Sequence, residues 1–221
     1  MEDQALKRKE IWNRSTVKIA GASILAPLSV LLQGIPPIFL TPWFMRIDFA
    51  AVPWILCWII FGWKSAILCL LISAPLVGLL GPFAGGWVGA IMKSVASIWM
   101  FMIPAIFATR IGSTKQLLDR RNVLLISAIL AIATRVIVTV FFNFYFALPI
   151  FFSMNHETII NFFSNPMFQS FISANIGVIG LSAFIIEIAF WNTIQGAIDL
   201  FSGMIIGNLV LNRFFKTGIK D

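Results

Sequence analysis

The stretch Arg46 to Lys64, RIDFAAVPWILCWIIFGWK, decides the fold of this chain, because it places two opposite charges, Arg46 and Asp48, directly before a short apolar segment rich in tryptophan. A helix rises about 1.5 Å per residue, so one from Phe49 to Trp63 falls well short of a hydrocarbon core of about 30 Å. Such a helix is stable in a membrane only where neighbouring protein covers its ends. We therefore expect it to form the wall of a cavity, with a binding site at its polar mouth.

The composition indicates a chain that folds in a lipid bilayer. Apolar residues make up 59% of the 221 residues, charged residues only 11%, and the mean hydropathy is +0.94, all far from the averages of soluble domains. Residues 1–221 are therefore expected to form one all-α integral membrane domain. Six transmembrane helices are predicted, over approximately 18–34, 49–63, 65–80, 85–108, 123–152 and 181–215.

The basic residues predict the orientation of these helices. With both termini in the cytoplasm and residues 1–17 as a basic cytoplasmic tail, the positive-inside rule is obeyed at every turn. The cytoplasmic segments then carry Lys7, Arg8, Lys9, Arg14, Lys18, Lys64, Arg110, Lys115, Arg120, Arg121, Arg213, Lys216 and Lys220. The net charge of +7 is thus explained by topology, which argues against a nucleic-acid partner.

Two of the predicted outside loops have a distinctive composition. Residues 33–48 hold Pro36, Pro37 and Pro42, which favour a stiff, extended loop able to cover a pocket. Residues 153–180 alternate apolar and polar positions in a way typical of an interfacial helix. This second loop is either a lid over the pocket or a segment resting on the lipid headgroups.

Short motifs along nearly the whole chain, in a shared order and spacing, resemble a known family. They are Ile47-Asp48-Phe49, Val52-Pro53, Phe61-Gly62, Gly86-Trp87-Val88-Gly89-Ala90, Ile103-Pro104-Ala105, Arg135, Asn143-Phe144-Tyr145, Leu148-Pro149 and Trp191-Asn192-Thr193-Ile194-Gln195-Gly196. Together with six helices and a short second helix, they resemble the substrate-binding S components of energy-coupling factor (ECF) vitamin transporters, and within that family the riboflavin-type branch.

The resemblance implies a function without enzymatic chemistry. Such a subunit binds a vitamin, with riboflavin as the expected ligand, in an outward-facing pocket in the plasma membrane of a prokaryote. It associates with a membrane coupling subunit and two cytoplasmic ATPases, and it needs no cofactor or metal of its own. The absence of a G-x-x-x-x-G-K-[ST] phosphate loop from the sequence agrees with this.

Uncharged polar residues are the first candidates for the pocket, since a vitamin ring needs a few oriented donors and acceptors among aromatic walls. Asn143 continues a stripe on the fifth helix that starts at Arg135 and passes through Thr139. Asn192 and Gln195 share a face of the last helix with Asp199. In riboflavin-binding relatives, the family pattern has Asn-x-x-Lys at the positions of Asn192 and Gln195. The missing positive charge means that the ligand is bound differently or is another vitamin; interhelical hydrogen bonding by this pair is the alternative.

Four charged residues fall inside predicted helices, where charge is costly. One interpretation pairs Lys93 with Glu187 and Arg135 with Asp199 simply to neutralise buried charge. For Lys93 and Glu187 we favour contact with the ligand or shaping of the pocket, although Glu187 lies about 140° from Asn192 on a helical wheel. For Arg135 and Asp199 we favour the structural pair.

Small residues on the first helix are candidates for contact with a partner. Ala22-x-x-x-Ala26 has a spacing that lets two helices approach closely. In S components an Ala-x-x-x-Ala patch on this helix docks against the coupling subunit, so the resemblance implies that role for Ala22 and Ala26. Gly203-x-x-x-Gly207 has the same spacing and is interpreted as internal packing.

Two other functions remain open. The same fold can carry a different vitamin or micronutrient. From another class, a small integral-membrane enzyme can use Lys93, Glu187 and Asp199 chemically, which predicts turnover rather than retention of a ligand.

Overall fold

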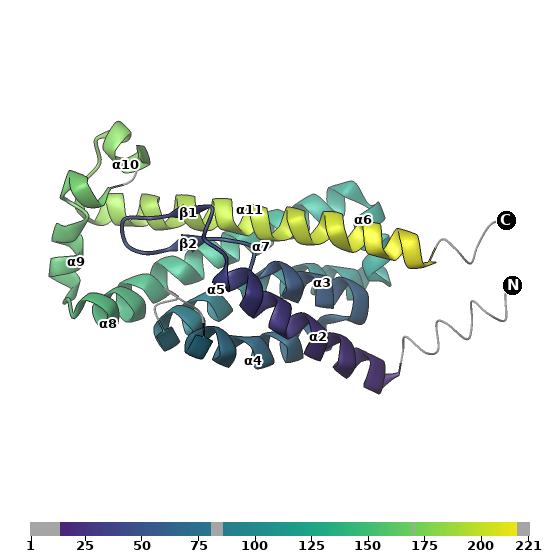
Figure 1. Ribbon diagram of the computed structural model, residues 1–221. Helices are drawn as coiled ribbons and strands as arrows, with labels where there is room; N and C mark the ends of the chain where they lie inside the picture. Colours follow the sequence, from purple (N-terminus) through teal and green to yellow (C-terminus); the bar gives the residue numbers. More distant parts are fainter. Residues whose placement is uncertain (1–13, 81–85, 170, 216–221) are drawn as a thin grey trace, which may run out of the picture.

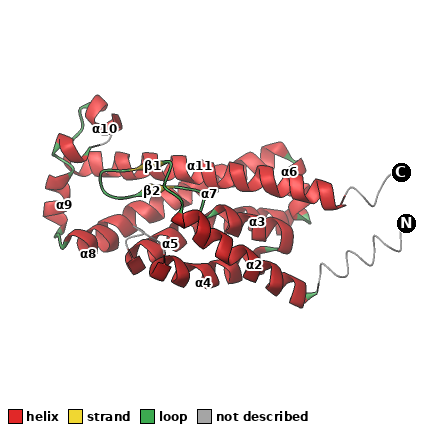
Figure 2. Ribbon diagram, viewed as in Figure 1, coloured by secondary structure: helices red, strands yellow, loops and turns green. Residues whose placement is uncertain are grey.

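The computed structural model describes residues 14–80, 86–169 and 171–215, and in them the protein is almost entirely helical (Figures 1 and 2). The elements in chain order are α2 (Ser15–Gly34), β1 (Phe39–Leu40), β2 (Arg46–Ile47), α3 (Val52–Phe61), α4 (Trp63–Leu80), α5 (Gly86–Ile111), α6 (Thr114–Asp119), α7 (Arg121–Phe142), the π-helix η1 (Asn143–Ala147), α8 (Leu148–Phe152), α9 (His156–Phe162), the 3-10 helix η2 (Pro166–Phe168), α10 (Phe171–Ile176) and α11 (Gly180–Phe215).

Four helices are long and apolar enough to cross a membrane. They are Ser15–Gly34, Gly86–Ile111, the continuous Arg121–Phe152 and Gly180–Arg213, while α3 and α4 are shorter apolar helices. The structure thus confirms the predicted helical architecture, and α3 is shorter than the helix predicted over residues 49–63. Outward-facing residues such as Ile24, Ile137 and Leu209 are 73%, 71% and 64% exposed, as suits side chains that meet lipid.

The helices lie side by side with their connections gathered at two ends (Figure 1). The start of α2, the end of α11 and the short helix α6 lie at one end, and α9 and α10 lie at the other. The basic residues Arg14, Lys115 and Arg213 belong to elements at the first end. This arrangement is the one that the positive-inside pattern requires, and the cytoplasmic side stays a prediction.

The turn between α3 and α4 depends on one glycine. Gly62 has a φ of 93°, and its N–H donates to the carbonyl of Trp58 at 2.9 Å. A side chain is strained at such a φ, whereas glycine adopts it readily. The next helix starts at Trp63, so the two short helices return on each other and pack together.

The loop of residues 33–48 folds into a small hairpin rather than a fully extended cover. β1 and β2 pair antiparallel, with Phe39 opposite Ile47 and Leu40 opposite Arg46. Thr41 closes the turn, because its hydroxyl accepts from the N–H of Met45 at 2.9 Å. The hairpin holds Trp43 to Arg46 over the interior of the protein, where these four residues line a cavity.

Two apolar clusters form the core, with polar residues between them along α11. One cluster includes Phe184 and Ile188 near the start of α11, and the other includes Leu200 and Met204 further along it. The range 192–199, between them, carries Asn192, Gln195 and Asp199, each at most 2% exposed. The hydrogen bonds of these buried polar groups must come from the protein or a ligand.

Candidate functional site

The candidate site is a cavity of about 390 Å³ inside the helical bundle. This is within the usual range for sites that hold small organic molecules. Its walls are largely apolar and include Trp43, Met45 and Phe151. The polar residues that line it are Gln33, Arg46, Lys93, Ser97, Arg135, Thr139, Asn143, Asn192 and Gln195.

The helix that supplies Asn143 changes its winding at this residue. η1 begins at Asn143 and ends directly before Leu148 and Pro149, which open α8. A proline within a helix lacks an N–H and crowds the carbonyl of the preceding turn, and the wider π turn lies directly before Pro149. The amide of Asn143 donates to the carbonyl of Thr139 at 2.8 Å, which fixes the side chain along the cavity wall.

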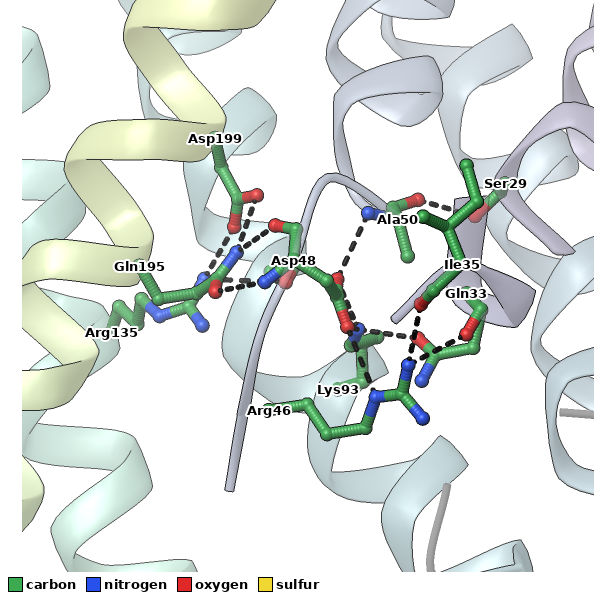
Figure 3. Close-up of polar contacts among 11 residues, drawn as sticks. Ser29, Gln33, Ile35, Arg46, Asp48, Ala50, Lys93, Arg135, Gln195 and Asp199 are labelled. Carbon is green, nitrogen blue, oxygen red and sulfur yellow. Dashed lines mark hydrogen bonds and ion pairs between the residues drawn. The ribbon is translucent and has the colours of Figure 1, made fainter. Parts of the chain in front are cut away.

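Asp48 is the centre of a buried polar network (Figure 3). Lys93 Nζ lies 2.6 Å from each carboxylate oxygen of Asp48 and also donates to Gln33 Oε1. Arg46 lies on the other side, with Nε 3.8 Å from Oδ2 of Asp48. The N–H of Ala50 donates to Oδ1 at 2.9 Å, so the carboxylate also caps the approach to α3.

Gln195 holds the backbone of Asp48 in place. Its Oε1 accepts from the Asp48 N–H at 3.0 Å, and its Nε2 donates to the Asp48 carbonyl at 2.7 Å. The second hydrogen of Nε2 goes to Oδ1 of Asp199 at 2.8 Å. Both amide hydrogens are therefore used within the protein, and Gln195 acts as a positioning residue for the hairpin.

Arg135 joins α5, α7 and α11 at the floor of the network. Its Nη1 donates to Asp199 at 3.0 Å and to Ser97 at 3.2 Å, and its Nε donates to Asn192 at 3.3 Å. Arg135 is 3% exposed and Asp199 is fully buried. The expected Arg135–Asp199 ion pair is thus confirmed, although Arg135 also lines the cavity.

Four of the five predicted ligand-binding residues come together at the cavity. Lys93, Asn143, Asn192 and Gln195 all line it, from α5, η1 and α11. Glu187 does not: it is fully buried, and its Oε1 accepts from the backbone N–H of Ser173 in α10 at 3.0 Å.

The alternative pairing of Lys93 with Glu187 was wrong. Lys93 pairs with Asp48, 45 residues earlier in the chain, while Glu187 is bonded to α10. Helical spacing shows which residues share a face of one helix, but it does not show which loop folds against that face. The hairpin supplied the counter-charge instead.

Ala22 and Ala26 lie inside the protein rather than on a free surface. Both have 0% exposure and belong to the first core cluster, where α2 packs against α3 and α4. The exposed side of α2 carries Ile24, Leu28 and Leu31. We therefore do not assign the docking role to Ala22 and Ala26.

Residues 153–180 pack beside the hairpin without reaching the cavity. Ile159 and Phe163 are buried against Trp43, with ring centroids of Trp43 and Phe163 5.5 Å apart. None of the described residues between 153 and 180 lines the cavity. A role as a lid stays a prediction.

Sequence reasoning missed several residues of the site, among them Ser97, which lines the cavity and accepts from Arg135. Gln33 and Trp43 carried no signal beyond their place in the proline-rich loop, and Asp48 was noted only as part of a charged couple at a helix mouth. The available signal for Asp48 was its place before a short apolar helix, because a lysine buried in the membrane, such as Lys93, needs a carboxylate as its partner.

Comparisons with known proteins support the fold. No protein-family model matches the sequence, and no curated relative matches it at a significant level. A solved structure of the S component of a bacterial ECF transporter is similar to this chain with a TM-score of 0.63 at 20% sequence identity, over 94% of this chain and 100% of that one. The chain therefore has the fold of an ECF transporter S component.

Proposed function

We propose that this protein is the substrate-binding subunit of an ECF-type importer and that it takes a vitamin from outside the cell. The single observation that carries the proposal is the cavity of about 390 Å³, largely apolar but lined by oriented amides and cations, within an S-component fold. The subunit would deliver its ligand together with a membrane coupling subunit and two cytoplasmic ATPases, in the plasma membrane of a prokaryote.

Riboflavin is the leading ligand. Asn143 and Asn192 line one cavity from neighbouring helices, and a flavin presents carbonyl and imide edges that amides can bond. The Asn192 amide now donates to the Ile188 carbonyl at 2.9 Å and contacts Met45 Sδ at 3.6 Å, so a bond to the ligand would replace the weak contact with sulfur. Gln195, where the family pattern has lysine, uses both amide hydrogens to hold Asp48 and Asp199. Because Gln195 supplies no positive charge at this position, another vitamin is the alternative ligand.

The enzyme alternative finds little support in the geometry. Lys93, Glu187 and Asp199 each bond a different partner, namely Asp48, Ser173 and Arg135. Catalytic acids and bases must lie within hydrogen-bonding distance of the same reacting group of the substrate. If the enzyme hypothesis were right, Glu187→Ala would abolish turnover of a substrate while leaving its binding intact.

The test is a titration of riboflavin into the purified protein in detergent, followed by tryptophan fluorescence. We expect saturable one-to-one quenching at submicromolar concentration, weakened at least tenfold by Asn192→Ala. Asn208→Ala is the matched control, since Asn208 is an exposed residue of the same helix outside this cavity. Absence of quenching in folded protein would reject riboflavin, and mass spectrometry of the co-purified ligand would then identify another vitamin or reject the transport subunit.

A further inference from the structure

The charged side chains that line the cavity are all cationic. Arg46, Lys93 and Arg135 line it, while the carboxylates of Asp48 and Asp199 stand behind them, at most 3% exposed, and do not. By formal count, three cations against two carboxylates leave one excess positive charge. Glu187, the remaining buried carboxylate among the described residues, is bonded to Ser173 of α10 and does not line the cavity.

The donors of Lys93 and Gln195 are already used within the protein. The ammonium group of Lys93 has three N–H donors, and it bonds Gln33 and both oxygens of Asp48. Gln195 donates its two amide hydrogens to the carbonyl of Asp48 and to the carboxylate of Asp199. Neither group has a hydrogen left to donate to a ligand while the network is intact.

Arg135 is different, because part of its guanidinium has no protein partner. Nε and Nη1 bond Asn192, Ser97 and Asp199, whereas Nη2 has no hydrogen-bond partner among the described residues. Nη2 is also not one of the fully enclosed polar atoms that lack a partner, so some of its surface is open. Arg135 is only 3% exposed and lines the cavity, from which we infer that the open surface of Nη2 faces the cavity.

We propose that the cavity takes an anionic ligand whose carboxylate or phosphate lies against Nη2 of Arg135. A guanidinium forms strong charge-assisted bonds with either anion. An excess positive charge in a membrane interior is costly, and an anionic ligand neutralises it. The proposal rests on the importer function proposed above, and it favours acidic vitamins or vitamin phosphates, riboflavin 5′-phosphate among them, over neutral riboflavin.

The test uses pairs of ligands in which one member carries an acidic group that the other lacks. Riboflavin is compared with riboflavin 5′-phosphate, nicotinamide with nicotinate, pyridoxal with pyridoxal 5′-phosphate, and biotinamide with biotin. Dissociation constants are measured by calorimetry on the purified full chain in a non-ionic detergent at constant ionic strength. We expect the acid of at least one pair to bind at least tenfold more tightly than its neutral partner.

Variants then assign the preference to Arg135. The double variant Arg135→Gln with Asp199→Asn removes one cation and one carboxylate, so the formal excess charge is unchanged but the anchor is gone. We expect it to lose the preference at least tenfold. Asp199→Asn alone keeps Arg135 and should retain or strengthen the preference, which also shows that loss of Asp199 does not unfold the site. Arg121→Gln, at an exposed position on α7, is the matched control.

The outcomes separate this proposal from the one it rests on. Saturable binding of a neutral vitamin with no gain from its acid overturns the anionic site and leaves the transport subunit standing. A preference for the acid that survives in the double variant overturns the role of Arg135. Binding of no acid by folded protein overturns the anionic site, and with no neutral binder either it overturns the transport function.

Discussion

The side-chain amide of Gln195 bonds both backbone groups of Asp48, accepting from its N–H at 3.0 Å and donating to its carbonyl at 2.7 Å. These residues are 147 positions apart in the chain. One amide in the last long helix thereby fixes the residue that joins the hairpin to α3. The lysine of the family pattern has no acceptor and cannot reproduce both bonds.

Gln195→Leu should destabilise the protein and loosen the hairpin. The substitution leaves the buried N–H and carbonyl of Asp48 unpaired, at a cost of roughly 1–3 kcal/mol for each group. We expect a lower thermal unfolding midpoint and faster hydrogen exchange at the amide of residue 48. Gln116→Leu, at an exposed position in α6, should change neither quantity. Unchanged exchange at residue 48 in Gln195→Leu would contradict the role assigned to this amide.

Removing Lys93 alone should be much worse than removing Lys93 and Asp48 together. Lys93→Met leaves the carboxylate of Asp48, 3% exposed, without its partner at 2.6 Å, and breaking a buried ion pair costs about 3–5 kcal/mol. The double variant Lys93→Met with Asp48→Asn should recover most of that loss in thermal unfolding. Lys64→Met, at an exposed position, is the control. Additive effects of the two single changes would argue against a coupled pair.

Gly203 and Gly207 should tolerate no side chain. A Cβ on Gly203 would lie 2.5 Å from Cγ2 of Ile55, and one on Gly207 would lie 2.6 Å from Cδ1 of Ile59. Alanine at either position therefore pushes α11 away from α3, and overpacking of this kind costs about 1–3 kcal/mol. Gly34→Ala is a matched control, because a Cβ there meets nothing within 4 Å. Equal thermal stability of Gly203→Ala and Gly34→Ala would show that the two helices pack less closely than described.

Cys57 and Cys69 should resist thiol reagents in the folded protein. Both are free and have 0% exposure within the first core cluster. Buried cysteine behaves as a small apolar residue, so a maleimide should label neither until the protein is unfolded in denaturant. Ser113→Cys, at an exposed position before α6, supplies a thiol that should react at once. Rapid labelling of the unaltered protein would indicate that the core opens.

Much of the architecture could be predicted because it is local. Long runs of apolar residues satisfy their backbone hydrogen bonds in lipid by forming helices, so the positions of these helices follow largely from hydropathy. The stripe of Arg135, Thr139 and Asn143 follows from helical geometry, and all three residues line the cavity. Gly203-x-x-x-Gly207 packs closely against α3, in agreement with its interpretation as internal packing.

The partners of the charged residues could not be predicted in the same way. Lys93 has its partner in a hairpin between two earlier helices, and Glu187 bonds a short helix that precedes its own. Ala22 and Ala26 match a docking pattern in sequence but are covered by α3 and α4. The exposure of a helical residue depends on which other elements pack against its helix, and spacing within that helix does not reveal this.

By itself the sequence predicted which segments are long apolar helices, which residues share a helical face, and that a pair of opposite charges precedes a short helix. Only the tertiary structure decided that Asp48 pairs with Lys93, that Gln195 holds the backbone of Asp48, and that Arg135 bonds Asp199, Ser97 and Asn192 beside the cavity. The physical reason is the distance along the chain between the residues that interact. Helix formation and burial in lipid are settled by neighbouring residues, whereas a buried charge takes its partner from whichever distant segment folds against it.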